Sequence, residues 1–315
     1  MKEIGGYLEL EEFRHQEYYP NLIALNTARN ALVYLCRAKQ IHKLYLPYYL
    51  CDSVSNVCNR EGIRYEYYHI NKDFTPDFNK RLDEGEYLYI VNYFGQLKRI
   101  NIENYKEKYG NIILDNVQAF FERPIEGIDT IYSCRKFFGV PDGAYLSTNA
   151  EELNLETDSS NGRMRHILGR YEGDVASEYY ADFKENDHSF TKLDIRYMSK
   201  LTHNILGVID YKKIIEKRNK NWDILHEALM RENKLKLVTP FAPYMYPFYC
   251  ENGMEIKKVL VAKKIFVPTL WPNVLGFEEC EFEKDYAENI LPLPIDQRYG
   301  VHEMEKVYRT LIEEL

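Results

Sequence analysis

The sequence predicts an α/β protein in which a large domain, built on a doubly wound and mostly parallel sheet between helices, precedes a smaller α+β C-terminal domain. Short apolar segments alternate with amphipathic ones between residues 28 and 133, which is typical of strands joined by helices. The chain has 315 residues, of which 45% are hydrophobic, enough for one large core and a smaller one. A long helical pattern then leads into the C-terminal region. We therefore expect a large cofactor-binding domain over residues 1–212 and a small domain over residues 213–315.

The large domain is predicted to alternate helices with strands. Apolar residues at helical spacing indicate helices over Ala28–Lys39, Ser53–Glu61 and Asn101–Tyr109. Asn26 or Thr27 is expected to cap the first of them, because either side chain can accept a hydrogen bond from a free N–H of the first turn. Strands are predicted from β-branched, aromatic and other apolar runs over Lys43–Pro47, Tyr65–Ile70, Tyr87–Tyr93, Asn111–Asp115, Thr130–Ser133 and Ala144–Leu146.

The second half of the chain gives a weaker pattern. Residues 150–205 are polar and aromatic without a clear period, so no element is predicted there. Helical spacing over Asp210–Glu232 predicts a long connection into the small domain. That domain is expected to mix strands with a last helix, over Leu235–Val238, Ile265–Pro268 and Val301–Leu315.

Composition and charge exclude several classes of function. The net charge of −8 is spread without long acidic or basic blocks, which argues against a nucleic-acid or membrane-surface role. The apolar runs are shorter than a membrane span, and residues 1–6 give no secretory signal. The six cysteines are scattered, with no Cys-x-x-Cys pair and no histidine at ligand spacing. We therefore expect reduced thiols in a cytoplasmic protein, and no metal site.

An acidic residue and a lysine follow neighbouring strands. Asp115 ends the segment Ile112-Ile113-Leu114-Asp115, and Lys136 comes shortly after the next predicted strand. Ligands of open α/β sheets bind at the carboxyl ends of the strands, where both residues would lie. Pyridoxal phosphate needs a carboxylate against its ring nitrogen and a lysine amine for its aldehyde. Each residue alone is more often structural or solvated, but the pair predicts a pyridoxal phosphate site.

Several segments resemble one enzyme family. Asp115–Phe121 resembles the Asp-Ala-Ala-Gln/His-Ala segment of the DegT/StrS-type nucleotide-sugar aminotransferases, and Lys136 with Asp142–Ala144 is similar to that family's lysine followed by Gly-Glu-Gly-Gly. Leu25–Leu32 is similar to the family's Gly-Thr-Ser-Ala-Leu. Leu291–Pro294, followed by an amphipathic helix, also matches. The resemblance extends over nearly the whole chain.

The resemblance implies a fold, an activity and roles for single residues. The fold would be the aspartate aminotransferase-like fold type I of pyridoxal phosphate enzymes. The activity would be transfer of an amino group from an amino acid, expected to be glutamate, to a nucleotide-linked keto-sugar in surface polysaccharide or amino-sugar biosynthesis. Lys136 would hold the cofactor's aldehyde and Asp115 its ring nitrogen. Gln118 would hydrogen-bond the cofactor or orient Asp115, and Val117 would cover one face of the ring. The protein is expected to be a homodimer.

The phosphate and the second face of the ring need further residues. Ala28 and Arg29 lie in the first helical turn, where backbone amides and the helix dipole favour an anion, and Ser133 is a further candidate for the phosphate. Plain solvation of Arg29 is the alternative. Tyr49 or Tyr93 is expected to stack on the ring, because Cys51 occupies the position of the family's aromatic residue. With 28 tyrosines in the chain, any one of them is more often core or surface than ligand.

Two other functions stay open at this point. A different pyridoxal phosphate reaction on a sugar, such as dehydration, is one; relatives that catalyse it commonly replace the lysine with histidine, and Lys136 speaks against it. The other is a catalytically degenerate scaffold with a binding or regulatory role. Cys51 makes it conceivable, as does Ile195–Ser199, which lacks the asparagine of the Gly-x-Asn-x-Arg-Met segment that reaches across to the other subunit in the family. Cofactor binding without turnover would distinguish it.

Overall fold

A single large sheet forms the central layer of the molecule. The computed structural model describes residues 4–13, 16–173 and 175–315. The sheet has eight strands in the order β1-β8-β7-β6-β5-β2-β3-β4. Their bounds are β1 (Ile23–Leu25), β2 (Lys43–Pro47), β3 (Arg64–Ile70), β4 (Pro76–Asp77), β5 (Glu86–Val91), β6 (Ile112–Asp115), β7 (Asp129–Ser133) and β8 (Ala144–Ser147).

The strands that matter for a ligand site run parallel. β2 pairs in parallel with β3 and β5, β5 with β6, and β6 with β7. β8 is antiparallel to both β7 and β1. The carboxyl ends of the parallel strands therefore meet at one edge of the sheet, as the sequence predicts.

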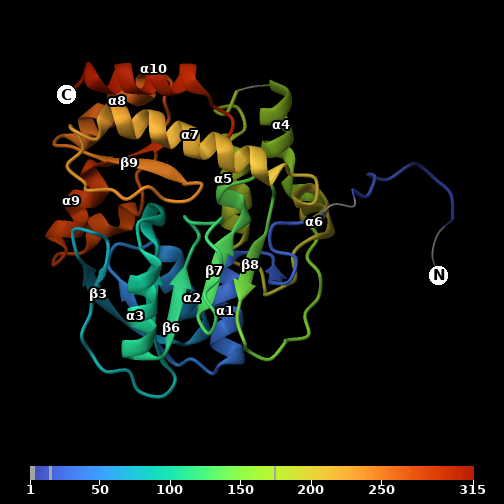
Figure 1. The fold of residues 1–315 in the computed structure, drawn as a ribbon. Helices are drawn as coiled ribbons and strands as arrows, with labels where there is room; N and C mark the ends of the chain where they lie inside the picture. Colours follow the sequence, from blue (N-terminus) through green and yellow to red (C-terminus); the bar gives the residue numbers. More distant parts are fainter. Residues whose placement is uncertain (1–3, 14–15, 174) are drawn as a thin grey trace.

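Helices cover both faces of this sheet. α3 (Arg99–Tyr109) lies in front of it, and α1 (Ala28–Ala38) and α2 (Asp52–Glu61) lie behind it (Figure 1). Thr27 caps α1, because its side chain accepts a hydrogen bond from the Asn30 N–H at 3.0 Å. Residues 30–36 of α1 are all buried, which makes this helix the main apolar cover of its face. Gly62, with φ +70°, ends α2 in the left-handed conformation that glycine favours.

The C-terminal part of the chain builds a second layer around a small sheet. β9 (Met245–Tyr249) pairs antiparallel with β10 (Ile290–Pro294). A separate apolar core there includes Trp222, Leu225 and Phe248. The helices of this part are α7 (Tyr211–Leu229), α8 (Gly253–Ala262), α9 (Glu281–Asn289) and α10 (Val301–Ile312). α7 and α10 lie side by side at the top of the view in Figure 1. The domain division at 212/213 stays a prediction, and it falls in the first turn of α7.

Two predicted strands are wrong. Leu235–Val238 is irregular, since the side chain of Gln96 takes the place of a neighbouring strand: it accepts from the Val238 N–H at 2.8 Å and donates to the Val238 carbonyl at 2.9 Å. Ile265–Pro268 is also irregular, although Ile265 and Val267 bury their side chains in the C-terminal core. Apolar alternation reports burial, and here burial occurs without strand pairing.

Other boundaries also differ from the prediction. The predicted strand Tyr87–Tyr93 ends at Val91, where the chain enters the short 3-10 helix η1 (Tyr93–Gly95) with Phe94 at φ 54°. Residues 150–205, for which the sequence predicts no element, contain the 3-10 helix η3 (Asn161–Arg163) and most or all of three α-helices. These are α4 (Arg165–Gly173), α5 (Tyr180–Ser189) and α6 (Lys200–Leu206). No helix of the described residues is both long and apolar enough to span a bilayer.

Candidate active site

Asp115 is a buried carboxylate at the carboxyl end of β6. Its side chain is held from two directions: the Tyr89 hydroxyl donates to Oδ2 at 2.7 Å, and the Val117 N–H donates to Oδ1 at 2.9 Å. The residue is 4% exposed. Burial raises the pKa of Asp115, while these two hydrogen bonds and the positive charge of Lys136 act in the opposite direction. A cation placed against this carboxylate would therefore be bound strongly.

Lys136 follows the neighbouring strand β7. It ends the 3-10 helix η2 (Cys134–Lys136), and its Nζ lies 5.4 Å from the ring centroid of Tyr244. Asp115 and Lys136 thus follow neighbouring parallel strands, at the same edge of the sheet, and the positive charge of Lys136 acts to lower the pKa of Asp115. Lys136 is half-buried, which leaves its amine partly shielded from water.

Gln118 carries an unpaired donor. The Phe94 N–H donates to its Oε1 at 2.9 Å. Because a backbone N–H can only donate, this bond fixes which end of the amide is oxygen. The other end, Nε2, is buried and has no hydrogen-bond partner among the residues that the structure describes. A buried donor without a partner costs free energy, and an acceptor brought against Nε2 would remove that cost.

The first turn of α1, where the phosphate is predicted to bind, contains an arginine that is already paired. Ala28 and Arg29 open the helix, and N–H groups of a first turn have no acceptor within the helix. The Arg29 guanidinium bonds to Asp187 of α5, with Nη1 3.2 Å from the Asp187 carbonyl oxygen and Nη2 3.3 Å from Oδ2. Arg135, next to the lysine, donates to Oδ1 of the same carboxylate at 3.0 Å. Asp187 thus joins the helix start to the lysine segment.

The other predicted cofactor residues lie at the same edge of the sheet. Ser133 is the last residue of β7 and is 8% exposed, and Val117 is half-buried. Tyr49 and Tyr93 are each 1% exposed. They belong to an aromatic cluster in which the Tyr93 hydroxyl donates to the Tyr49 carbonyl at 2.6 Å and the Trp271 ring meets Tyr49 edge-on. The roles given to these four residues stay predictions.

The segment after the lysine is anchored by a buried carboxylate. Asp142 is fully buried and accepts hydrogen bonds from the Ser199 N–H at 3.0 Å, from the Ser199 hydroxyl at 2.8 Å and from the Thr202 hydroxyl. Gly143 follows at φ +116°, and a Cβ there would lie 3.0 Å from Thr202 Cγ2 and 3.2 Å from Cys134 Cβ. The acid-glycine pair therefore fixes the lysine segment against α6.

The C-terminal part of the chain supports the lysine segment from the other side. Arg218 of α7 is 1% exposed, and its Nε donates to Gln297 Oε1 at 2.9 Å. Gln297 in turn donates to the Phe137 carbonyl at 2.7 Å, and the Arg218 guanidinium lies 4.6 Å from the Phe137 ring centroid. The residue after Lys136 is thus held by the region predicted to be the small domain.

Several residues of this site are absent from the sequence-based prediction. Asp187 and Ser199 lie in the stretch 150–205, where no period indicated an element. Tyr89 is one of many tyrosines that lie in apolar segments. Only the pairing register of β5 with β6 brings its side chain to Asp115. The segment Ile195–Ser199 pairs within its own chain, since the Met198 N–H donates to the Ala24 carbonyl at 3.0 Å.

Comparison with known proteins identifies the fold. No protein-family model and no curated protein matches the chain. Among solved structures, it is similar to a DegT/DnrJ/EryC1/StrS aminotransferase from Brucella abortus, with 16% identity, 93% of this chain and 85% of that chain covered, and a TM-score of 0.64. It is similar to NtdA from Bacillus subtilis with bound PMP, with 15% identity, 93% and 72% covered, and a TM-score of 0.67. It is also similar to the sugar aminotransferase CalS13 from Micromonospora echinospora, with 12% identity, 94% and 88% covered, and a TM-score of 0.64. The fold expected from the resemblance is confirmed.

Proposed function

We propose that this chain is a pyridoxal phosphate-dependent aminotransferase that delivers an amino group to a sugar. The observation that carries the proposal is the buried Asp115 carboxylate, held by Tyr89 and Val117 and acted on by the charge of Lys136. Solved structures of the same fold include an aminotransferase from Brucella abortus and the sugar aminotransferase CalS13. A buried carboxylate that keeps hydrogen-bonding capacity, at the same edge of the sheet as a lysine, suits a protonated ring nitrogen and an aldehyde-binding amine.

The residues present fit the cofactor. Asp115 would hold a proton on the ring nitrogen, because each of its oxygens accepts one hydrogen bond and keeps capacity for another. The unpaired Gln118 Nε2 would donate to an oxygen of the ring. The amides of Ala28 and Arg29, with Ser133, would bind the phosphate. Val117 and Tyr49 or Tyr93 would contact the two faces of the ring.

Residues of the chain itself would hold the cofactor and move the proton. Pyridoxal phosphate, when bound, supplies an electron sink for the negative charge left at the donor's α-carbon. Lys136 would hold the cofactor's aldehyde when no amino donor is bound, and its amine would be free while a donor occupies that position. The free Lys136 amine would serve as the base that moves the proton between the donor's α-carbon and the C4′ carbon of the cofactor. Tyr244, whose ring centroid lies 5.4 Å from Nζ, would limit water near this amine.

We further propose glutamate as the amino donor and a nucleotide-linked keto-sugar as the acceptor, within amino-sugar or surface polysaccharide biosynthesis in the cytoplasm. The family resemblance of the segments around Asp115 and Lys136 supports both choices. The same resemblance supports a homodimer as the working form. Retention of the lysine and of the paired carboxylate weighs against sugar dehydration and against a degenerate scaffold.

The proposal is tested by amino transfer itself. The full chain, loaded with pyridoxal phosphate, is incubated with ¹⁵N-glutamate and a panel of nucleotide-linked keto-sugars, and ¹⁵N in the sugar product is followed by mass spectrometry. We expect label in at least one sugar with the wild type and with Lys212→Ala, an exposed-lysine control. We expect none with Lys136→Ala. Cofactor binding without label transfer to any sugar would favour the degenerate scaffold instead.

A further inference from the structure

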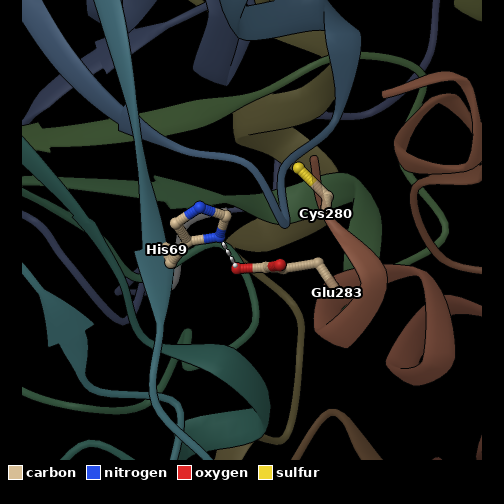
Figure 2. A group of neighbouring side chains, drawn as sticks. All are labelled: His69, Cys280 and Glu283. Carbon is tan, nitrogen blue, oxygen red and sulfur yellow. Dashed lines mark hydrogen bonds and ion pairs between the residues drawn. The ribbon is translucent and has the colours of Figure 1, made fainter. Parts of the chain in front are cut away.

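A second group of reactive side chains lies outside the candidate active site, where the end of β3 meets the start of α9. His69 is on β3, Cys280 precedes the first turn of α9, and Glu283 lies within that turn (Figure 2). One donor atom from each, a ring nitrogen, a sulfur and a carboxylate oxygen, all lie within 4.8 Å of one another. His69 and Glu283 are 214 positions apart in the sequence, so only the fold brings them together.

Glu283 has an unused oxygen in this cluster. Its Oε1 accepts from the Ile70 N–H at 3.1 Å and lies 3.0 Å from His69 Nδ1. Glu283 is fully buried, and its Oε2 has no hydrogen-bond partner within the described part of the chain. A buried carboxylate oxygen without a partner is costly, because water no longer solvates it. A bound cation would satisfy it.

We propose that His69, Cys280 and Glu283 bind one divalent transition-metal ion of the zinc type. Imidazole nitrogen, thiolate sulfur and carboxylate oxygen are the zinc donors of proteins, and three such ligands leave a fourth position open. A thiolate and a carboxylate together balance the two charges of the ion. Magnesium and calcium, which prefer oxygen ligands, suit a site with sulfur and nitrogen poorly.

The geometry requires a small closure. Zinc–ligand distances of about 2.0–2.3 Å place neighbouring ligand atoms of a tetrahedral site about 3.6 Å apart. The more distant ligand atoms, which lie within 4.8 Å of one another, therefore need to approach by at most about 1.2 Å, which side-chain rotation of Cys280 or His69 can supply. The His69 side chain is 47% exposed, so the open side faces solvent and admits both the ion and a water as fourth ligand.

The surroundings orient His69 toward the two residues of α9. The Tyr48 ring lies 4.8 Å from the His69 ring, and the Tyr48 hydroxyl donates to Glu279 Oε1 at 3.0 Å, next to Cys280. A metal ion here would tie β3 of the large sheet to a helix of the C-terminal part. Its role would be to fix α9 against β3, and it would not take part in the proposed amino transfer.

The test uses the full chain after treatment with a chelator. Co²⁺ is added first, because a cobalt–thiolate bond gives a charge-transfer absorption in the near ultraviolet, and Zn²⁺ is then titrated in by competition. We expect one Co²⁺ per chain, displaced by Zn²⁺, and no displacement by Mg²⁺. Zn²⁺ should also raise the temperature of unfolding, because an ion that binds only the folded chain stabilises it.

Three variants separate a built site from nonspecific thiol binding. Cys280→Ser should lose the absorption. Glu283→Gln keeps an acceptor for the Ile70 N–H and so should remain folded. Since even the outer partners of metal ligands are worth about 10–100-fold in affinity, Glu283→Gln should weaken Zn²⁺ binding by about 100-fold. Cys51→Ser, which removes a free, partly exposed thiol elsewhere, should change neither. The proposal is wrong if the chelator-treated wild type binds neither ion, or if Cys280→Ser or Glu283→Gln binds them as the wild type does.

Discussion

Replacing Asp142 with alanine should destabilise the fold and loosen the lysine segment at the same time. The carboxylate accepts hydrogen bonds from the Ser199 N–H, the Ser199 hydroxyl and the Thr202 hydroxyl. Asp142, Ser199 and Thr202 are all buried. The two hydroxyls can rotate, and that of Ser199 also bonds to Ser160 Oγ at 2.6 Å. The Ser199 N–H cannot rotate, so alanine at position 142 leaves it without a partner.

The size of the effect follows from these contacts. A hydrogen bond to a charged group contributes about 1.5–3 kcal/mol, and an orphaned buried donor costs about 1–3 kcal/mol. Allowing for the hydroxyls that find other partners, we expect Asp142→Ala to lower the free energy of unfolding by about 3–5 kcal/mol. Asp142→Asn keeps one acceptor oxygen for the Ser199 N–H and can donate to Thr202, so its cost should be about 1–2 kcal/mol.

Urea unfolding followed by near-ultraviolet circular dichroism measures this difference. With a slope near 3 kcal/mol per molar urea, the midpoint of Asp142→Ala should fall by about 1 M or more. Asp223→Ala, at an exposed position on α7, is the matched control and should stay within about 0.5 kcal/mol of the wild type. Equal midpoints for Asp142→Ala and Asp223→Ala would refute the anchoring role. An asparagine variant as unstable as the alanine variant would refute the reasoning from acceptors.

Three further changes test the contacts around the proposed cofactor. Gln118→Leu removes the unpaired Nε2 donor, so pyridoxal phosphate binding measured by absorbance titration should weaken about 10–100-fold; unchanged affinity would mean that Nε2 does not contact the cofactor. Burial raises the pKa of Asp115, and the hydrogen bond from Tyr89 partly counteracts this. Tyr89→Phe removes that bond, so the pKa of Asp115 should rise further and cofactor binding should begin to fail at a higher pH than in the wild type. Loss of binding at the same pH in both proteins would contradict this. Burial raises the pKa of Asp187, but the charges of Arg29 and Arg135 outweigh this effect and hold the pKa below its usual value. The stability that Asp187 adds over Asp187→Asn should therefore be fully present above the ordinary aspartate pKa and be lost as the pH falls through the lower pKa of the folded state. Urea midpoints of both proteins across that pH range measure this, and a difference in midpoint that does not depend on pH would count against the ion pairs.

The large sheet and the first pair of site residues could be predicted because their signals are local. Asp115 follows three consecutive isoleucine or leucine residues, and such a run marks a buried parallel strand whose end is also the end of the run. Thr27 could be predicted as a cap for the same reason, since capping depends on neighbours within one turn. The parallel pairing of β6 with β7 then puts the ends of both strands, and so Asp115 and the segment of Lys136, at the same edge of the sheet.

The remaining residues could not be predicted because their roles come from tertiary contacts. Asp187 matters only because α5 brings it between two arginines from distant segments. Leu235–Val238 has the apolar pattern of a strand, but the side chain of Gln96 satisfies the Val238 backbone. The sequence predicts no metal site, since no histidine lies at ligand spacing from a cysteine. His69 and Cys280 become neighbours only when α9 packs on β3.

The covalent attachment of the cofactor to Lys136 tests the central claim most directly. Absorbance spectra of the full chain with added pyridoxal phosphate are recorded before and after borohydride reduction, for the wild type, Lys136→Ala and the control Lys212→Ala. The account predicts a visible band that borohydride fixes to the chain in the wild type and in Lys212→Ala, with the label on the peptide that contains Lys136, and no fixation in Lys136→Ala. Absence of a band in the wild type, or equal fixation in Lys136→Ala, would contradict it.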